Sequence, residues 1–157
     1  MGHIDRRQLL IGGTAGALGI AAAALGSTTA LADEGKGLVG TWDVWITDKS
    51  RGGPAVEGAT TFAPGGGIVT MDSGNASTGI GSWTGGDEGG GFKGRFMQFA
   101  FNPDGSTAGK VIVTIPDGKR SGNTIRGSFT YVIYALNGTP IFSNGHGTFT
   151  GTRFAAA

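Results

Sequence analysis

Glycine makes up 33 of the 157 residues, and its distribution restricts the fold more than any other feature of the sequence. Glycine fractions this high occur in disordered chains, but here the glycines are interleaved with Val, Ile, Thr, Phe and Trp. Glycine disfavours long helices, whereas β-branched and aromatic residues between turn residues are typical of short strands. The pattern therefore predicts an all-β domain with many tight turns.

Alternation of apolar and polar residues predicts eight or nine antiparallel strands. Pro116-Asp117-Gly118 is expected to end the sixth, and Asn137-Gly138 is typical of a two-residue hairpin turn. A chain without helices has nothing to cover its strand edges, and barrel closure removes those edges. We therefore predict a single closed antiparallel up-and-down β-barrel of about eight strands, with a β-sandwich as the alternative. The expected strands are 38–47, 56–62, 67–72, 78–84, 92–102, 110–115, 125–136, 140–143 and 146–154.

The N-terminal segment has the features of an export signal. Arg6 and Arg7 precede the only long apolar run, which extends from Leu9 to Leu25, and Ala30-Leu31-Ala32 offers the small residues that a signal peptidase reads. Residues 5–10 resemble a twin-arginine motif. We predict a signal peptide over 1–32, cleaved after Ala32, and a secreted domain over 33–157. The alternative is an uncleaved anchor, because ~17 apolar residues is the minimum that spans a membrane.

Composition excludes several classes of function for the mature domain. Removing Arg6, Arg7 and Asp5 from the totals of 12 basic and 11 acidic residues leaves ten of each. A chain with no net charge has no electrostatic signature of nucleic-acid binding. The sequence contains no cysteine, which excludes disulfides and thiolate metal sites, and its mature part has one histidine, His146. We expect no metal, no cofactor, no nucleic-acid partner and no stable membrane insertion after cleavage.

One local pattern recurs in the predicted strands: a glycine, a hydroxyl residue and an aromatic residue. We interpret the glycine as allowing a bend, while the aromatic residue two positions later faces the same side and fills the core. The four occurrences are Gly40-Thr41-Trp42, Gly81-Ser82-Trp83, Gly127-Ser128-Phe129 and Gly147-Thr148-Phe149.

The two ends of the predicted barrel carry a family resemblance. Gly40-Thr41-Trp42 in the first strand and Gly151-Thr152-Arg153 in the last resemble the signature of lipocalins, within the calycin group. The resemblance implies that Arg153 lies across Trp42 and closes one end of the barrel, so that both residues are structural. Avidin-type barrels share the opening motif, but their biotin site is not recognisable here. The signal and composition resemble those of secreted actinobacterial proteins.

Strand alternation predicts which side chains face the barrel interior. Phe96 and Gln98 share the inward face of one strand, and Phe129 and Tyr131 that of another, whereas Trp45 is expected to face outward. A mostly apolar cavity with a few polar groups is typical of a small-molecule site, although an eight-stranded barrel is either hollow or filled. The candidate ligand-binding residues are Trp83, Phe96, Gln98, Phe129, Tyr131 and Phe149.

Three functions fit this sequence. The first is a secreted protein that binds a small, mostly apolar molecule. The second is a cofactor-free cyclase or isomerase, resembling the allene oxide cyclase and polyketide cyclase barrels, which acts by shaping its substrate, with Glu57 or Tyr131 as a candidate acid. The third is a cell-surface interaction protein with a filled barrel and an outer patch near Trp45. His146 is interpreted as a surface residue, because a catalytic triad has no other support in the sequence.

Overall fold

The computed structural model describes residues 37–74, 76–86 and 90–154. The predicted signal peptide, residues 1–32, lies outside the described residues. Within them, no helix has the length and apolar character needed to cross a membrane.

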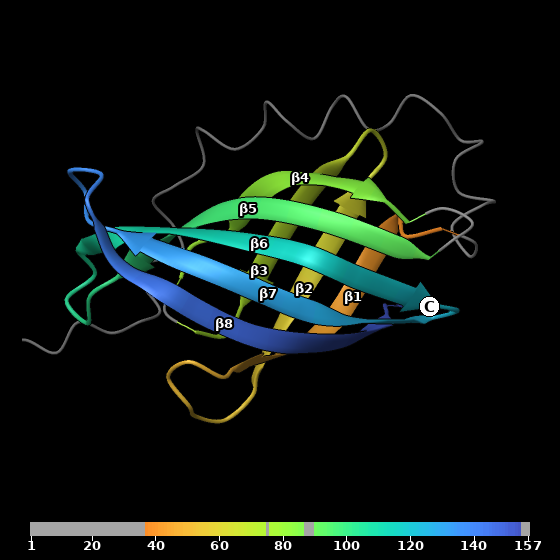
Figure 1. Cartoon of the computed structure of the whole chain (residues 1–157), viewed down its shortest axis with the longest axis horizontal. Helices are drawn as coiled ribbons and strands as arrows, with labels where there is room; N and C mark the ends of the chain where they lie inside the picture. The colour runs from red at the N-terminus through yellow and green to blue at the C-terminus, as the bar shows by residue number, and fades with distance from the viewer. Residues whose placement is uncertain (1–36, 75, 87–89, 155–157) are drawn as a thin grey trace, which may run out of the picture. The chain divides into compact units, whose positions relative to one another are not determined.

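The described chain forms one closed antiparallel barrel (Figure 1). Every strand pairs with its neighbours in sequence, and the first strand also pairs with the last, which closes the sheet. This confirms the predicted up-and-down barrel, and a β-sandwich is excluded. The eight strands are β1 (Gly40–Asp48), β2 (Val56–Ala63), β3 (Gly67–Asp72), β4 (Gly79–Gly85), β5 (Gly91–Phe101), β6 (Thr107–Ser121), β7 (Thr124–Tyr134) and β8 (Pro140–Arg153).

The prediction that the sixth strand ends at Ile115 is wrong, because β6 continues through Pro116-Asp117-Gly118 to Ser121. Between the pairs Gly94↔Ile115 and Phe92↔Gly118, two residues of β6 face one residue of β5. Such a bulge leaves a residue outside the ladder, which accommodates a proline that has no N–H to donate. The segment Pro116-Asp117-Gly118, which has the sequence of a turn, therefore forms a bulge within β6.

The connection between β7 and β8 also differs from the prediction. A two-residue turn of the Asn-Gly type needs positive φ at both central residues, but none of the described residues other than glycine has positive φ. Only Gly138, with φ of 85°, adopts the left-handed conformation, and its N–H donates to the Ala135 carbonyl over 2.9 Å. The turn is therefore a longer one that ends in glycine. Beyond it, β8 is one continuous strand and not two.

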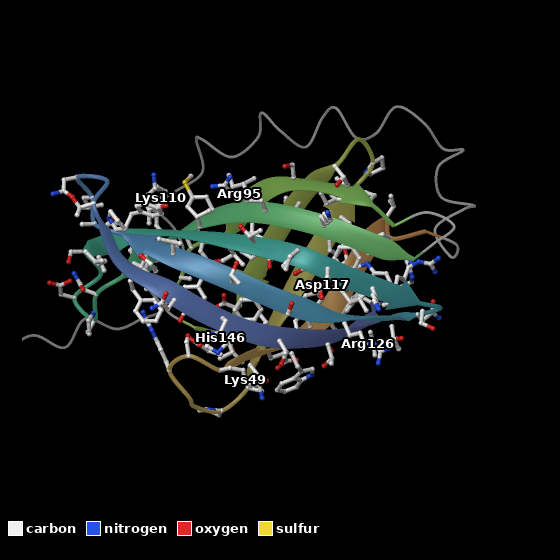
Figure 2. All side chains as sticks on the ribbon, viewed as in Figure 1. Lys49, Arg95, Lys110, Asp117, Arg126 and His146 are labelled. Carbon is white, nitrogen blue, oxygen red and sulfur yellow. The ribbon has the colours of Figure 1, made fainter. Side chains whose placement is uncertain are left out.

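The two faces of the sheet follow the expected alternation. Charged side chains such as Arg95, Lys110 and Arg126 project from the outer surface (Figure 2). Trp45 is 48% exposed on the outside, as predicted. Apolar side chains fill the end of the barrel where β1 begins and β8 ends. There the most deeply buried side chains pack together, namely Leu38, Trp42, Phe62 and Ile68.

Candidate functional site

The barrel interior contains a cavity of about 450 Å³. It lies toward the opposite end of the barrel, the mouth, where β1, β3, β5 and β7 end and their successors begin. Its floor includes Phe62 and Ile68, which separate it from the closed end. The apolar residues that line it are Val44, Ile46, Phe62, Ile68, Ala76, Phe96, Ala100, Phe101, Val111, Val113, Ile115, Ile125, Phe129, Ile133 and Phe149.

The cavity exists because its aromatic residues lie opposite glycines on the neighbouring strands. On β7 and β8 the arrangement is reciprocal, because each strand offers glycines to the aromatic residues of the other. A Cβ atom at Gly145 would lie only 2.5 Å from the Tyr131 ring, so that ring rests against the bare backbone. The directly opposed pairs are Gly127↔Phe149, Phe129↔Gly147 and Tyr131↔Gly145 on β7 and β8, and Gly81↔Phe96 on β4 and β5.

This pairing explains the recurring glycine and aromatic pattern better than the predicted bend does. The interior of an eight-stranded barrel is just wide enough for ordinary side chains to fill it. Where one strand has a glycine, the aromatic ring of the neighbouring strand lies over the glycine backbone. The ring then covers the sheet and does not extend to the barrel axis. The glycines therefore leave space in the interior, and the aromatic rings become the cavity wall.

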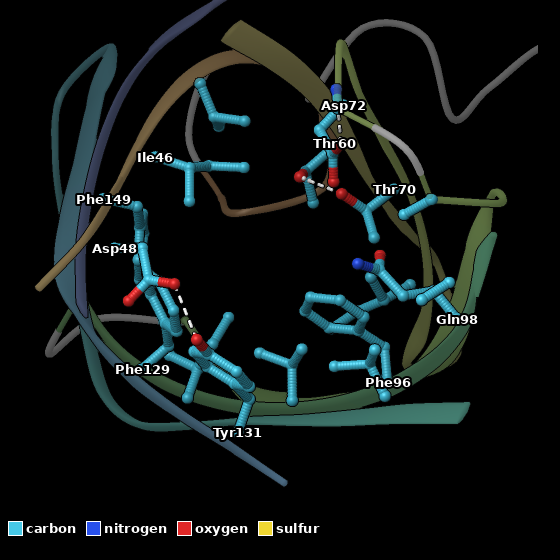
Figure 3. Close-up of a pocket in the computed structure, with 18 of the residues that line it drawn as sticks. Ile46, Asp48, Thr60, Thr70, Asp72, Phe96, Gln98, Phe129, Tyr131 and Phe149 are labelled. Carbon is cyan, nitrogen blue, oxygen red and sulfur yellow. Dashed lines mark hydrogen bonds between the residues drawn. The ribbon is translucent and has the colours of Figure 1, made fainter. Parts of the chain in front are cut away.

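Gln98 places a polar group in this apolar cavity. It lies on the inward face of β5 and is partly buried. No other described residue makes a hydrogen bond to its side-chain carboxamide, so its donors and acceptor face the cavity. Figure 3 shows the carboxamide pointing into the cavity next to Thr70. A polar group left unpaired in an apolar site is ready to bind a ligand.

Two threonines on β2 and β3 extend the polar surface beside Gln98. Thr70 Oγ1 donates to the Ala59 carbonyl over 3.3 Å, and the Thr60 and Thr70 hydroxyl oxygens are 2.9 Å apart. Either hydroxyl can donate in the Thr60–Thr70 bond, and both oxygens keep a lone pair. Both hydroxyls therefore offer acceptor capacity toward the cavity.

A second polar group lies across the mouth from Gln98 (Figure 3). The Tyr131 hydroxyl donates to Asp48 Oδ2 over 2.6 Å. Asp48 Oδ1 accepts from the Ser50 hydroxyl over 2.6 Å and from the Ser50 N–H over 2.9 Å. These bonds connect the end of β1 and the loop after it to the inward face of β7.

The pKa values of the two partners move apart. Burial raises the pKa of Asp48, but the hydrogen bonds from Ser50, Tyr131 and Arg51 outweigh burial, so the net pKa is lowered. Burial and the bond to Asp48 raise the pKa of Tyr131. At neutral pH the pair is therefore a carboxylate held by a neutral phenol.

Arg51 covers part of the mouth from the loop between β1 and β2. Its guanidinium carbon lies 5.8 Å from the centroid of the Tyr131 ring and 5.0 Å from that of Phe142. The Arg51 side chain is itself exposed to solvent. It therefore places one positive charge above the aromatic rim and outside the apolar interior.

The structure brings together five of the six sequence-predicted ligand-binding residues, because Phe96, Gln98, Phe129, Tyr131 and Phe149 all line the cavity. It does not bring Trp83 to them. Trp83 faces inward but lies at the closed end, where its ring meets Phe62 edge-on at 5.8 Å and its Nε1 donates to the Ala63 carbonyl over 3.1 Å.

The predicted closure residues meet at the closed end. The Arg153 guanidinium carbon lies 4.3 Å from the centroid of the Trp42 ring. Arg153 Nη1 donates to the Val39 carbonyl over 2.8 Å, and Nη2 donates to the Gly37 carbonyl. A Cβ atom on Gly40, whose φ is 125°, would lie 2.6 Å from Arg153 Nη1, so only glycine leaves room for the guanidinium.

The candidate residues named from the sequence leave out five other polar residues that line the cavity, which are Asp48, Arg51, Thr60, Thr70 and Asp72. Trp42 faces inward, and Asp48 lies an even number of positions later on the same strand. Alternation therefore predicts that Asp48 faces inward as well. Arg51 lies in a loop, where alternation gives no information. Glu57 lies on the outer face opposite Trp45, and the exposed His146 has Nδ1 3.0 Å from the Asn144 carbonyl, so neither residue lines the cavity.

No group of three or more metal-ligating side chains occurs in the part of the chain that the structure describes. No protein-family model matches the chain, and the searches of curated proteins and of solved structures gave no significant match. The geometry of the cavity is therefore the basis for the function proposed below.

Proposed function

We propose that this protein binds a small, mostly apolar molecule in the barrel cavity. The observation that carries the proposal is the Gln98 carboxamide, without a hydrogen-bond partner in the described chain, inside a cavity of about 450 Å³ with a mostly apolar wall. Small-molecule sites combine such walls with a few polar groups that orient the ligand. A filled barrel would not leave this space, so the cavity favours binding over a purely structural role.

The directions of the pKa shifts favour binding over acid–base catalysis. A catalytic acid or base works best when its pKa lies near the working pH. The pKa of Asp48 is lowered and that of Tyr131 is raised, so both move away from neutrality. The pair is suited to hydrogen bonding and to fixing the shape of the mouth.

A cofactor-free cyclase or isomerase is the second candidate. Its support is the aromatic cavity wall, which is able to hold an apolar substrate in a reactive conformation without acid–base groups. The same cavity serves both functions. The two differ in whether the bound molecule leaves unchanged.

We place this activity outside the cell, and we propose that the barrel is related to the lipocalins. The support for export is Arg6 and Arg7, the apolar run after them and Ala30-Leu31-Ala32. The support for kinship is the Arg153 guanidinium over the Trp42 ring.

Native mass spectrometry of the protein purified from its own culture medium tests binding directly. We expect a retained small molecule, and its return unchanged after incubation identifies a carrier, whereas a changed product identifies an enzyme. An empty protein that also fails to bind N-phenyl-1-naphthylamine, a neutral fluorescent apolar probe, would overturn the proposal.

Gln98→Leu gives the matched test of the site. We expect the variant to fold and to bind the retained molecule about tenfold more weakly, which corresponds to ~1.4 kcal/mol. Thr130→Val is the control, because Thr130 is exposed on the outer face of β7. Equal loss in both variants would show that the effect does not come from the cavity.

A further inference from the structure

The charges that line the cavity are confined to its mouth. Among the described lining residues the charged side chains are Asp48, Asp72 and Arg51. All three lie where β1 and β3 end or in the loop that follows β1. The interior between this rim and the floor is lined by apolar side chains, Gln98 and two threonines.

This distribution disfavours an anionic ligand head inside the cavity. The exposed Arg51 lies over the rings of Tyr131 and Phe142, so it does not supply a positive charge to the interior. The two carboxylates leave the rim with one net negative charge. An anion buried without a cationic partner costs several kcal/mol.

A cationic head is disfavoured by the position of the free polar group. Asp48 accepts hydrogen bonds from Ser50 and Tyr131, and Asp72 Oδ1 accepts one from the Gly74 N–H over 2.9 Å. A cation held by Asp48, across the mouth, would place only its apolar tail beside Gln98. The carboxamide would then be buried with no partner, which costs about 1–3 kcal/mol.

Gln98 and Thr70 form one polar patch inside the wall. A Cβ atom on Gly79 would lie 2.6 Å from Thr70 Cγ2 and 3.4 Å from Gln98 Oε1, so the two side chains meet over this glycine. The patch offers the Gln98 amide protons as donors, and it offers Gln98 Oε1 and the Thr60 and Thr70 oxygens as acceptors.

A hydroxyl group matches this patch better than a group that only accepts. It accepts from the Gln98 amide and donates to Gln98 Oε1 or to a threonine oxygen. A ketone or ether would satisfy the amide and leave the acceptors without a donor. The cavity of about 450 Å³ lies within the range of small-molecule sites, roughly 300–1,000 Å³.

We propose that the ligand is a neutral, mostly apolar alcohol, with its hydroxyl at the Gln98–Thr70 patch. This inference rests on the proposed binding function and specifies its ligand class. Carboxylates of the same length are then poor ligands.

A series of compounds with one tail and four heads tests the class. Dodecan-1-ol, dodecyl methyl ether, dodecanoate and dodecylammonium are compared, below their aggregation concentrations, for displacement of N-phenyl-1-naphthylamine from the full-length protein. We expect the alcohol to displace the probe at a concentration at least tenfold lower than any of the other three. Stronger displacement by dodecanoate or dodecylammonium, or equal displacement by the ether, would overturn the inference.

The variant Gln98→Leu tests whether the preference for the alcohol comes from the Gln98–Thr70 patch. In this variant the alcohol and the ether are expected to displace the probe equally, while Thr130→Val retains the preference of the natural chain. An unchanged preference in Gln98→Leu would also overturn the inference. Probe binding without alcohol selectivity refutes only the ligand class, whereas absence of probe binding, with an empty protein in native mass spectrometry, refutes the binding function as well.

Discussion

The closed end and the mouth of the barrel are built from the same strands, but their polar side chains differ in how they are hydrogen-bonded. At the closed end the Trp42 indole N–H donates to the Leu38 carbonyl over 2.9 Å, and the Arg153 guanidinium caps two further carbonyls. In the cavity Gln98 faces open space without a partner in the described chain.

This difference separates stability from function along the barrel axis. Hydrogen bonds to buried polar groups help to hold one packing arrangement. Unpaired groups cost stability, and proteins retain them where a ligand uses them. We therefore expect substitutions at the closed end to act mainly on the free energy of unfolding, and substitutions at the mouth to act mainly on binding.

Trp42→Ala should have the largest effect. The Trp42 side chain is fully buried, so its removal leaves a cavity and should lower the free energy of unfolding by about 3–5 kcal/mol. Urea denaturation measures this loss. The control is Trp45→Ala on the outer face of β1, for which we expect a change below about 1 kcal/mol. Similar losses in both variants would contradict the comparison.

Arg153→Met should have the second largest effect, a loss of about 2–3 kcal/mol, because the carbonyls of Val39 and Gly37 lose a charged donor. Arg153→Lys should lie between the natural chain and Arg153→Met, since lysine keeps the charge without the planar fork. Thermal unfolding ranks the three proteins. A lysine variant as stable as the natural chain would show that the fork is not needed.

Gly145→Ala tests the wall of the cavity and should cost about 1–3 kcal/mol, because its new Cβ overlaps the Tyr131 ring. It should also weaken binding by displacing that ring into the cavity. Gly91→Ala is the matched control, since a Cβ there would contact nothing within 4 Å. Loss of stability without loss of binding in Gly145→Ala would break the proposed link between glycine pairing and the cavity.

The smallest expected effect is that of pH on the Asp48–Tyr131 pair. An acid whose pKa is lowered by folding stabilises the protein above its unfolded pKa, ~3.9 for Asp, and this stability is lost as the pH falls through the folded pKa. Tyr131, with its raised pKa, stabilises the fold below ~10, and this contribution is lost as the pH rises through its folded pKa. The rim is open to water, so each effect should stay below about 1 kcal/mol.

Urea denaturation across both pH ranges measures these losses. Tyr131→Phe should remove the alkaline loss and reduce the acid loss. Tyr134→Phe should keep both, because Tyr134 lies near Lys110 and is absent from the cavity lining. Identical pH profiles for the natural chain and Tyr131→Phe would show that the pair does not couple the mouth to folding.

Alternation along single strands made the barrel and most of its wall predictable. Phe96 and Gln98, like Phe129 and Tyr131, are two positions apart, so their shared inward face follows from the period of a strand. Trp83 obeys the same rule and faces inward. Its depth along the barrel axis, however, depends on how β4 is aligned with its neighbours, which one strand does not encode.

Features that depend on pairing between strands were not predictable from one sequence. Each glycine and aromatic pair joins residues that are distant in sequence, such as Tyr131 and Gly145, and becomes visible only when the register is known. The Pro116-Asp117-Gly118 bulge has the sequence of a turn, and only the pairing of the flanking residues with β5 and β7 identifies it as part of a strand. The contact of Arg51 with the rim depends on loop conformation.

The pairing of β1 with β8 also determines where this barrel is best attached to a surface. The start of β1 and the end of β8 lie side by side, with Trp42 opposite Arg153 and the Phe154 N–H donating to the Thr41 carbonyl over 2.9 Å. Both lie at the end opposite the mouth. A linker fused before Gly37 or after Phe154 therefore starts away from the opening, so a barrel immobilised on a sensor surface through either linker keeps its cavity accessible to solution.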